Sequence, residues 1–187
     1  MIPEEQRDAY WQPDIEGVAL GIAVADYGRE AVTLMGPTAA RLHGVIPRAL
    51  ATATVAVPRQ RPALVTTVGR IQFVTRNVDK LDVQRTTTDI TAGWMTTPEQ
   101  TVLDLADRPN LGGIAPATTE EAITTLTHRC DLQLVAQLAQ RQRKLAAWQR
   151  YCWLVGFPAL PTRTEIPTLG LRGTADPTAY GLVVTAA

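Results

Sequence analysis

The hydrophobic residues of this 187-residue chain change their spacing at about Thr97, and this change limits the folds open to the chain. Before it, between Thr52 and Thr96, short runs mix threonine with β-branched and small apolar residues, as β-strands do. After it, apolar residues recur every three or four positions, as on one face of a helix. Strands followed by helices favour an α+β fold over alternating strand and helix units.

Six short segments are predicted to contribute strands to an antiparallel β-sheet. The segment Val68-Gly69-Arg70 offers a tight hairpin turn between two of them, because glycine adopts turn conformations readily. The predicted strands are 32–35, 52–57, 64–68, 70–75, part of 81–90, and 94–96.

Helices are expected at both ends of this sheet. An N-terminal helical segment is predicted over 15–27, followed by a short helix over 37–43 that begins at a proline and stops before Gly44. The C-terminal helical half begins with a helix capped by Thr97, with proline at its first position and glutamine at its third. That helix is expected to end at Arg108-Pro109.

Further helices complete the C-terminal half. A second capping pattern at Thr118 predicts a helix to about His128, and a third helix is predicted over 131–147. Residues 148–157 continue or restart that third helix. From Pro158 onward, prolines and glycines predict an irregular tail that closes with a strand over 180–185. We expect a single domain over 1–187, with a subdivision into 1–110 and 111–187 as the alternative.

Charge is balanced overall but not locally. The chain has 18 basic and 18 acidic side chains, which argues against a general nucleic-acid coat. Residues 1–16 carry five acids and one arginine, whereas 129–150 carry one acid and five cations. Either these segments are solvated or lie against each other, or the basic one meets an oppositely charged partner. The five candidate partner-binding cations are Arg129, Arg141, Arg143, Lys144 and Arg150.

Several kinds of catalytic site are excluded or disfavoured. The chain contains no serine, so no serine-nucleophile mechanism is open to it. Cys130 and Cys152 lack metal-ligand spacing, and His128 beside Cys130 would point to another face of a helix. We therefore expect free thiols, no metal and no cofactor. No signal segment or apolar run of about 20 residues is present, so a soluble cytoplasmic protein without membrane contact is expected.

Individual polar and aromatic residues leave alternatives open. His43, at the end of a predicted helix, is either a polar cap of that helix or functional. Asp104 and Asp107 are either acid–base or metal groups, or they are salt-bridged. The aromatic residues Trp148, Tyr151 and Trp153 lie either in the core or at an interface, where aromatics and arginine concentrate.

Two segments on either side of the predicted strands carry a resemblance to a known family. The first runs Gly36-Pro-Thr-Ala-Ala-Arg-Leu-His-Gly44, and the second runs from Met95 to Ala106 and contains Thr-Pro-Glu-Gln-Thr-Val-Leu-Asp-Leu. Together they resemble the AbiEi family of antitoxins, in which a small-residue helix ending in Leu-His-Gly precedes a β-region. A helix beginning with Thr-Pro or Ser-Pro and containing Asp-Leu then follows. The resemblance covers about residues 15–110.

The resemblance implies a type IV antitoxin that neutralises a cognate nucleotidyltransferase-like toxin. Family members commonly carry an N-terminal winged-helix DNA-binding domain; about 35 residues precede the first segment here, so we expect no complete winged helix. Two alternatives stay open: an atypical kinase-like enzyme that phosphorylates the toxin with ATP and magnesium, and a DNA-binding autorepressor. The oligomeric state is open too. The candidate residues for the enzyme are Arg41, His43, Glu99 and Asp104.

Overall fold

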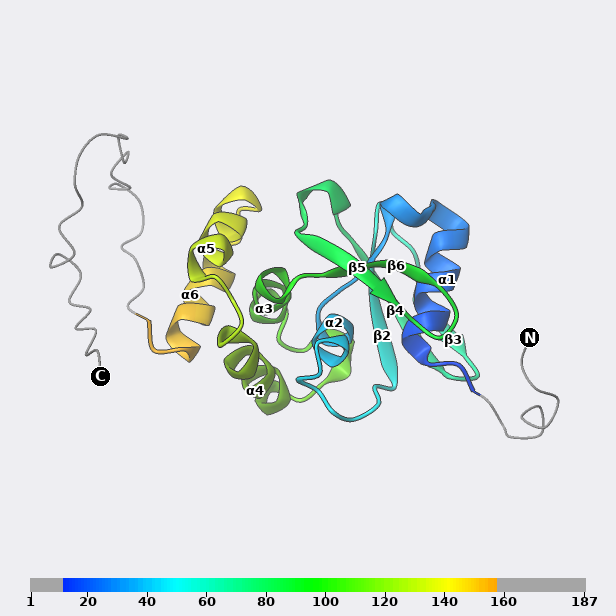
Figure 1. The fold of residues 1–187 in the computed structure, drawn as a ribbon, viewed down its shortest axis with the longest axis horizontal. Helices are drawn as coiled ribbons and strands as arrows, with labels where there is room; N and C mark the ends of the chain where they lie inside the picture. The colour runs from blue at the N-terminus through cyan, green and yellow to red at the C-terminus, as the bar shows by residue number, and fades with distance from the viewer. Residues whose placement is uncertain (1–11, 158–187) are drawn as a thin grey trace, which may run out of the picture.

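A mixed six-stranded sheet lies between one helix on one side and a group of helices on the other (Figure 1). The structure is a computed structural model, and it describes residues 12–157. The predicted acidic segment before residue 12, the tail after residue 157 and the strand over 180–185 lie outside the described residues. The α+β class predicted from the order of elements is confirmed.

The strands run in the order β3-β4-β2-β1-β6-β5. The predicted hairpin is present, since β3 and β4 pair antiparallel around the turn before Gly69. However, β4 lies beside β2 and β6 beside β1, and both of these pairs are parallel. The expectation of an antiparallel sheet was wrong for those two pairs, because β4 turns back from the edge strand β3 and inserts next to β2. The strands are β1 (Thr33–Leu34), β2 (Thr52–Val57), β3 (Leu64–Thr66), β4 (Gly69–Thr75), β5 (Val83–Thr87) and β6 (Ala92–Thr96).

The central strand β2 is covered on both faces. Val55 and Val57 belong to the apolar cluster under α1 (Ile15–Tyr27), whereas Ala56 belongs to a cluster on the opposite face. Side chains alternate between the faces of a strand, so a strand buried on both sides needs apolar residues at consecutive positions. The same reason explains Phe73 and Val74 in β4, which face opposite sides.

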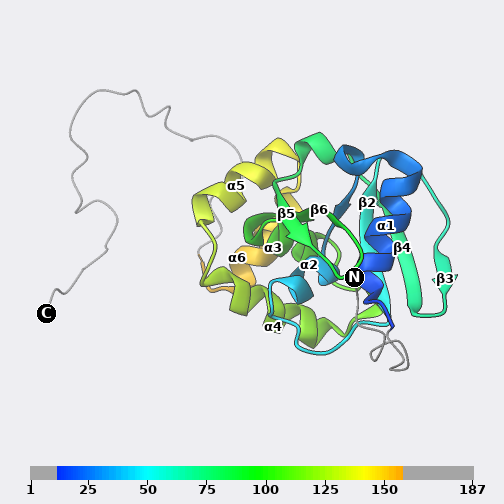
Figure 2. The same ribbon diagram turned by 45° about the vertical axis from the view of Figure 1, so that its right-hand side comes forward.

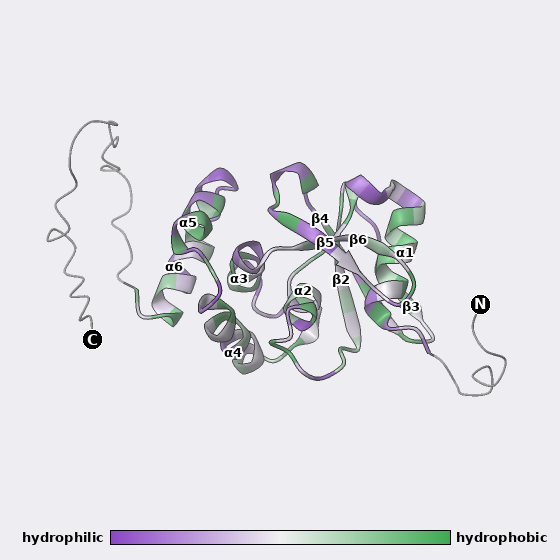
Figure 3. Cartoon of the chain, in the orientation of Figure 1, coloured by the Kyte–Doolittle hydropathy of each residue, from purple (hydrophilic) through white to green (hydrophobic). Residues whose placement is uncertain are grey.

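Helix α1 covers one face of the sheet and has the predicted bounds. Its first turn is held by the β5–β6 turn, since Asp89 Oδ2 accepts a hydrogen bond of 2.8 Å from the backbone N–H of Asp14. Hydrophobic residues run along α1, and hydrophilic ones mark the edge strand β5 (Figure 3). A polar edge strand discourages pairing with further strands.

The helices on the other face begin with α2 (Pro37–Leu42) and α3 (Pro98–Asp107), followed by α4 (Pro116–Thr127). The cap predicted at Thr97 is confirmed: its side chain accepts a hydrogen bond of 3.3 Å from the backbone N–H of Gln100. The cap predicted at Thr118 is wrong, because α4 begins two residues earlier at Pro116. Short 3-10 turns occur at Arg29–Ala31, Val78–Lys80 and Leu111–Gly113.

The helix predicted over 131–147 is divided into α5 (Leu132–Arg141) and α6 (Leu145–Leu154). The break lies at Arg143, whose φ of 58° is left-handed. The backbone N–H of Lys144 donates to Ala139 O at 2.7 Å, and that of Arg143 donates to Gln140 O at 3.1 Å. This pair of bonds is a Schellman ending, which usually uses glycine. Because arginine stands there instead of glycine, no residue type at this position marks the end of the helix.

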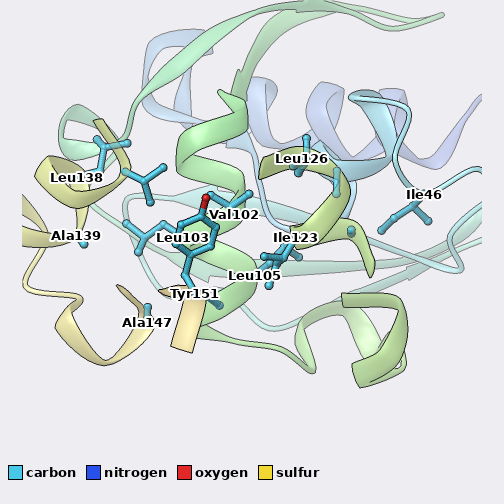
Figure 4. Close-up of a cluster of buried hydrophobic side chains, with 14 of the residues drawn as sticks. Ile46, Val102, Leu103, Leu105, Ile123, Leu126, Leu138, Ala139, Ala147 and Tyr151 are labelled. Carbon is cyan, nitrogen blue, oxygen red and sulfur yellow. The ribbon is translucent and has the colours of Figure 1, made fainter. Parts of the chain in front are cut away.

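Helix α3 is the centre of the helical half and contacts α4, α5 and α6. Tyr151 from α6 lies fully buried beside Leu103 and Val102 of α3 (Figure 4). This cluster also includes Ala40 and Leu50, so residues on both sides of position 110 share one core. Seen after a 45° turn, α5 and α6 remain on the far side of α3 from α1 (Figure 2).

Candidate functional site

The end of α2 meets the start of α3 and the α4–α5 connection through a set of polar contacts. His43 caps α2, and its Nε2 lies 2.9 Å from the carbonyl oxygen of Thr96. Burial lowers the pKa of His43, and nearby Arg129 lowers it further, against the opposing effects of the Thr96 carbonyl and Glu99. A neutral imidazole that donates from Nε2 fits this position. His43 therefore anchors α2 to the end of β6.

Glu99 and Arg129 extend the same contact region. The Glu99 carboxylate accepts a hydrogen bond of 3.0 Å from the backbone N–H of Asp131, at the start of α5. The Arg129 guanidinium donates to the carbonyl oxygen of His43 at 2.9 Å. Glu99 thus joins α3 to the α4–α5 connection, and Arg129 joins that connection to the end of α2.

Arg41 points toward α1 on another side of α2. Its Nη1 lies 3.1 Å from Oε1 of Glu16, a residue that is only 2% exposed. Burial raises the pKa of Glu16, although its backbone hydrogen bond and Arg41 act in the opposite direction. Within the described residues, Oε1 of Glu16 and Nε of Arg41 have no hydrogen-bond partner. The two side chains form an ion pair between α1 and α2.

Asp104 lies at the centre of a buried network on the inner side of α3. Its Oδ1 accepts hydrogen bonds of 3.0 Å from Arg76 Nη2 and from Gln100 Nε2. The Gln100 and Gln142 amides donate to each other, at 3.3 and 2.5 Å, and Arg76 also donates to Gln142 at 3.1 Å. Burial raises the pKa of Asp104 to about 6, against the opposing effects of Arg76 and Gln100. This network joins the end of β4, α3 and the α5–α6 turn.

Asp107 adds a more exposed carboxylate to this network. Its Oδ2 lies 2.7 Å from Lys144 Nζ and 3.6 Å from Arg76 Nη1. Arg108 lies 3.8 Å from the same oxygen. The structure shows that Asp104 and Asp107 are salt-bridged, which is one of the two predicted alternatives.

The four residues named as catalytic candidates fall into three sets of contacts: His43 with Glu99, Arg41 with Glu16, and Asp104 with Arg76. No described hydrogen bond or ion pair joins any two of Arg41, His43, Glu99 and Asp104, although Glu99 is near enough to His43 to affect its pKa.

The two cysteines are free in the described part of the chain. Burial raises the pKa of Cys130 to about 12, so its thiol is protonated near neutral pH. A protonated thiol is a poor nucleophile and a poor metal ligand. Among residues 12–157, no group of three or more potential metal ligands occurs.

Four of the five predicted partner-binding cations also bond within the molecule. Besides Arg129 and Lys144, Arg141 donates to the carbonyl oxygen of Lys80 at 3.1 Å, and Arg150 donates to that of Ala106 at the end of α3. In the described residues, Arg143 makes no such bond, and it is exposed at the α5–α6 turn. Arg143 is therefore the cation most available to a partner.

The three aromatic residues of α6 divide between core and surface. Tyr151 is buried and Trp148 packs on it, with ring centroids 5.7 Å apart. Trp153 is 78% exposed and lines a groove of about 420 Å³ between α3, α4 and α6. Tyr151 therefore belongs to the core with Trp148 packed on it, whereas Trp153 lies on the surface, and its role at an interface stays a prediction.

A family model of the AbiEi antitoxin C-terminal domain matches residues 31–157, well over half of the 187-residue chain. The chain belongs to the AbiEi antitoxin family. The match extends past the expected limit near residue 110 and includes α4, α5 and α6. A search of curated proteins found no match. In this AbiEi-family domain, the matched region therefore contains the buried network, the basic α5–α6 turn and the groove beside Trp153.

Membership of the family supports an antitoxin role and, in general terms, a toxin as partner. None of the helices described for this AbiEi-family protein has the length and apolar character needed to cross a membrane. Sequence reasoning missed Arg76, Gln100 and Gln142 as members of the network around Asp104. Only Gln100 carried a signal, as the third residue of the predicted helix start.

Proposed function

We propose that this AbiEi-family antitoxin neutralises a nucleotidyltransferase-like toxin by binding it. The family match is the observation that carries the proposal. The placement of Arg41, His43, Glu99 and Asp104 supports binding over catalysis, because each makes a contact that holds two elements together. No cofactor is needed for such a mechanism.

The cations of the basic segment are the proposed contacts to an acidic surface of the toxin. Arg129, Arg141, Lys144 and Arg150 hold their positions through intramolecular bonds, which lowers the entropy cost of ordering them in a complex. Arg143 is exposed at the turn between α5 and α6 and contributes a charge without a described bond. Charges of one sign on a surface speed association with an oppositely charged partner.

The test combines the purified antitoxin with the product of the neighbouring gene, whose nucleotidyl transfer is followed by incorporation of labelled nucleotide. Binding with loss of transfer activity and no change in toxin mass supports the proposal. A toxin that stays active and unbound contradicts it. A mass increase of one phosphate in the presence of ATP and magnesium supports the kinase-like alternative instead, and binding of the promoter fragment at low salt would favour the autorepressor.

Charge reversal at Arg143 tests the contribution of the basic surface to binding without changing a contact that holds the fold. Arg143→Glu is expected to slow association with the toxin about tenfold and to lessen its dependence on salt, because it reverses a charge on the proposed contact surface. The fold should be unchanged, because the Arg143 side chain is exposed and makes no described hydrogen bond or ion pair. Arg70→Glu is the matched control, since Arg70 is an exposed arginine on β4, away from α5 and α6. Equal effects of the two substitutions would show that only overall charge matters.

A further inference from the structure

The α5–α6 turn contains a strained backbone position. In residues 12–157, Arg143 has φ of 58°, whereas every other residue with a positive φ is a glycine. A residue with a Cβ costs free energy in this conformation, so it persists only where the surrounding contacts impose it. Glycine would form the same turn with less strain. The fold alone therefore does not explain why an arginine stands here.

Gln142, the residue before Arg143, is fixed by side chains from two other parts of the molecule. Its amide exchanges hydrogen bonds of 2.5 and 3.3 Å with the amide of Gln100 on α3. Its Oε1 also accepts a hydrogen bond of 3.1 Å from Arg76, which follows β4. Gln100 is fully buried, so these bonds join the turn to the interior of the molecule. A buried hydrogen-bond network of this kind restricts the turn to one arrangement.

Two further residues of the turn are also attached through their side chains. Arg141 donates to the carbonyl oxygen of Lys80 at 3.1 Å, and Lys144 Nζ lies 2.7 Å from Asp107 Oδ2. Arg143 differs from its neighbours, because its side chain is exposed and has no hydrogen bond or ion pair in the described part of the chain. The turn thus holds three side chains inward and leaves one cation free for a partner.

Resting on the proposed function, we infer that Gln142 is a positioning residue for the contact between Arg143 and the toxin. Its bonds to α3 hold the turn in the strained conformation, and from that conformation the Arg143 guanidinium meets a carboxylate of the toxin. An arginine on a turn that is ordered before binding loses less freedom in the complex than one on a flexible turn. The planar guanidinium can then bind the carboxylate through two parallel hydrogen bonds, a geometry that depends on its orientation.

Gln142→Met tests this role, because methionine keeps the length of the side chain and lacks its amide. Binding of the neighbouring gene's product to the full-length antitoxin is expected to weaken about three- to tenfold, since the turn must then be ordered on binding. The backbone amides of Arg143 and Lys144, which bond to α5, should exchange hydrogen faster. Gln149→Met is the matched control, since Gln149 is an exposed glutamine of α6 without a described side-chain bond. Unchanged binding by Gln142→Met overturns the inference and leaves the proposed function intact.

A double-mutant cycle separates positioning from a general effect on the fold. If Gln142 acts through Arg143, then Gln142→Met should cause little further loss of affinity in an Arg143→Ala background. All four proteins are compared well below their Tm, which circular dichroism verifies. Equal losses of affinity in the two backgrounds overturn the inference, because Gln142 would then act only on the stability of the fold.

Arg143→Gly tests the same contact with the network left intact. Glycine adopts a positive φ without strain, so the Tm should not fall. Binding should weaken at least about fivefold, because the cation is lost. Binding as tight as that of wild type overturns the inference, and so does a lowered Tm. If wild-type antitoxin neither binds nor neutralises the toxin, both this inference and the proposed function fail.

Discussion

Both faces of the sheet carry an apolar cluster, but they differ in the further contacts that join the covering helices to the sheet. On the α1 side, the contacts are apolar and close: a Cβ added at Gly69 would lie 2.4 Å from Ile15, and one at Gly93 would lie 3.0 Å from Leu20. On the helical side, the sheet is joined to α3 and the α5–α6 turn by the buried Arg76–Asp104 network. The α1 side should therefore be sensitive to side-chain volume, and the helical side to charge and pH.

The largest effect is expected from Arg76→Met on the helical side. It leaves Asp104 buried without its cation, which typically costs about 3–5 kcal/mol of unfolding free energy. Urea unfolding measures this loss. Arg61→Met is the control on the α1 side: Arg61 pairs with Asp26 and covers the Phe73 ring, but its side chain is 27% exposed. A cost below about 1 kcal/mol is expected for that surface pair.

Repeating Arg76→Met in an Asp104→Asn background sharpens this result. The cost should fall by at least about 1 kcal/mol, because the two residues are in direct contact. Equal costs in the two backgrounds would mean that Arg76 stabilises the protein through other contacts.

Gly69→Ala should give the next largest effect, on the α1 side. Gly69 has φ of 143°, and an added Cβ would lie 2.7 Å from the carbonyl oxygen of Ala51. Strained backbone and overpacking together predict a loss of about 2–4 kcal/mol in unfolding free energy. Gly21→Ala in α1 is the matched control, since nothing lies within 4 Å of its Cβ. It should stabilise the protein by about 0.5–1 kcal/mol. Similar losses at both positions would contradict the difference in packing.

The pH dependence of stability tests the network further. Burial raises the pKa of Asp104 from 3.8 to about 6, so the folded protein retains this proton to higher pH than the unfolded chain. The contribution of Asp104 is fully present below about pH 4 and is lost as pH rises through about 6, by about 3 kcal/mol. Wild-type protein should lose this amount relative to Asp104→Asn between pH 4 and 7.5.

Comparing the two proteins cancels the other groups that titrate in this range. Glu16, with a raised pKa, acts in the same direction as Asp104, whereas His43, with a lowered pKa, acts in the opposite direction. Both are present in wild-type protein and in the variant. Parallel pH profiles from urea unfolding would show that Asp104 titrates normally in the folded state.

The smallest effect is expected at the start of α3. Thr97 accepts from the Gln100 N–H and donates to Asp82 Oδ2 at 2.8 Å, so Thr97→Ala should cost about 1 kcal/mol. Thr118→Ala is the control, because Thr118 lies inside α4 and does not cap it. A loss below about 0.5 kcal/mol is expected there in thermal unfolding. Equal losses would argue that Thr118 acts as the cap after all.

The sequence by itself determined the local elements of this protein. The mixture of threonine and small or β-branched apolar residues in β2, the cap at Thr97 and the alanines of α1 are properties of neighbouring residues. The structure has these elements where they were predicted. The family motifs at Gly36 and Met95 are local signals of the same kind. The positions of the site candidates along the chain were also clear, but their partners were not.

Only the tertiary structure decided how these elements meet. The parallel pairing of β4 with β2 depends on where the β3–β4 hairpin packs, which no short pattern encodes. The break at Arg143 is held by contacts of Gln142 and Lys144 with α3, residues about 40 positions away. For the same reason, Asp104 acquired its partner Arg76 only through folding. Local preferences fix helices and strands, whereas buried charge pairs and strand order depend on contacts between distant segments.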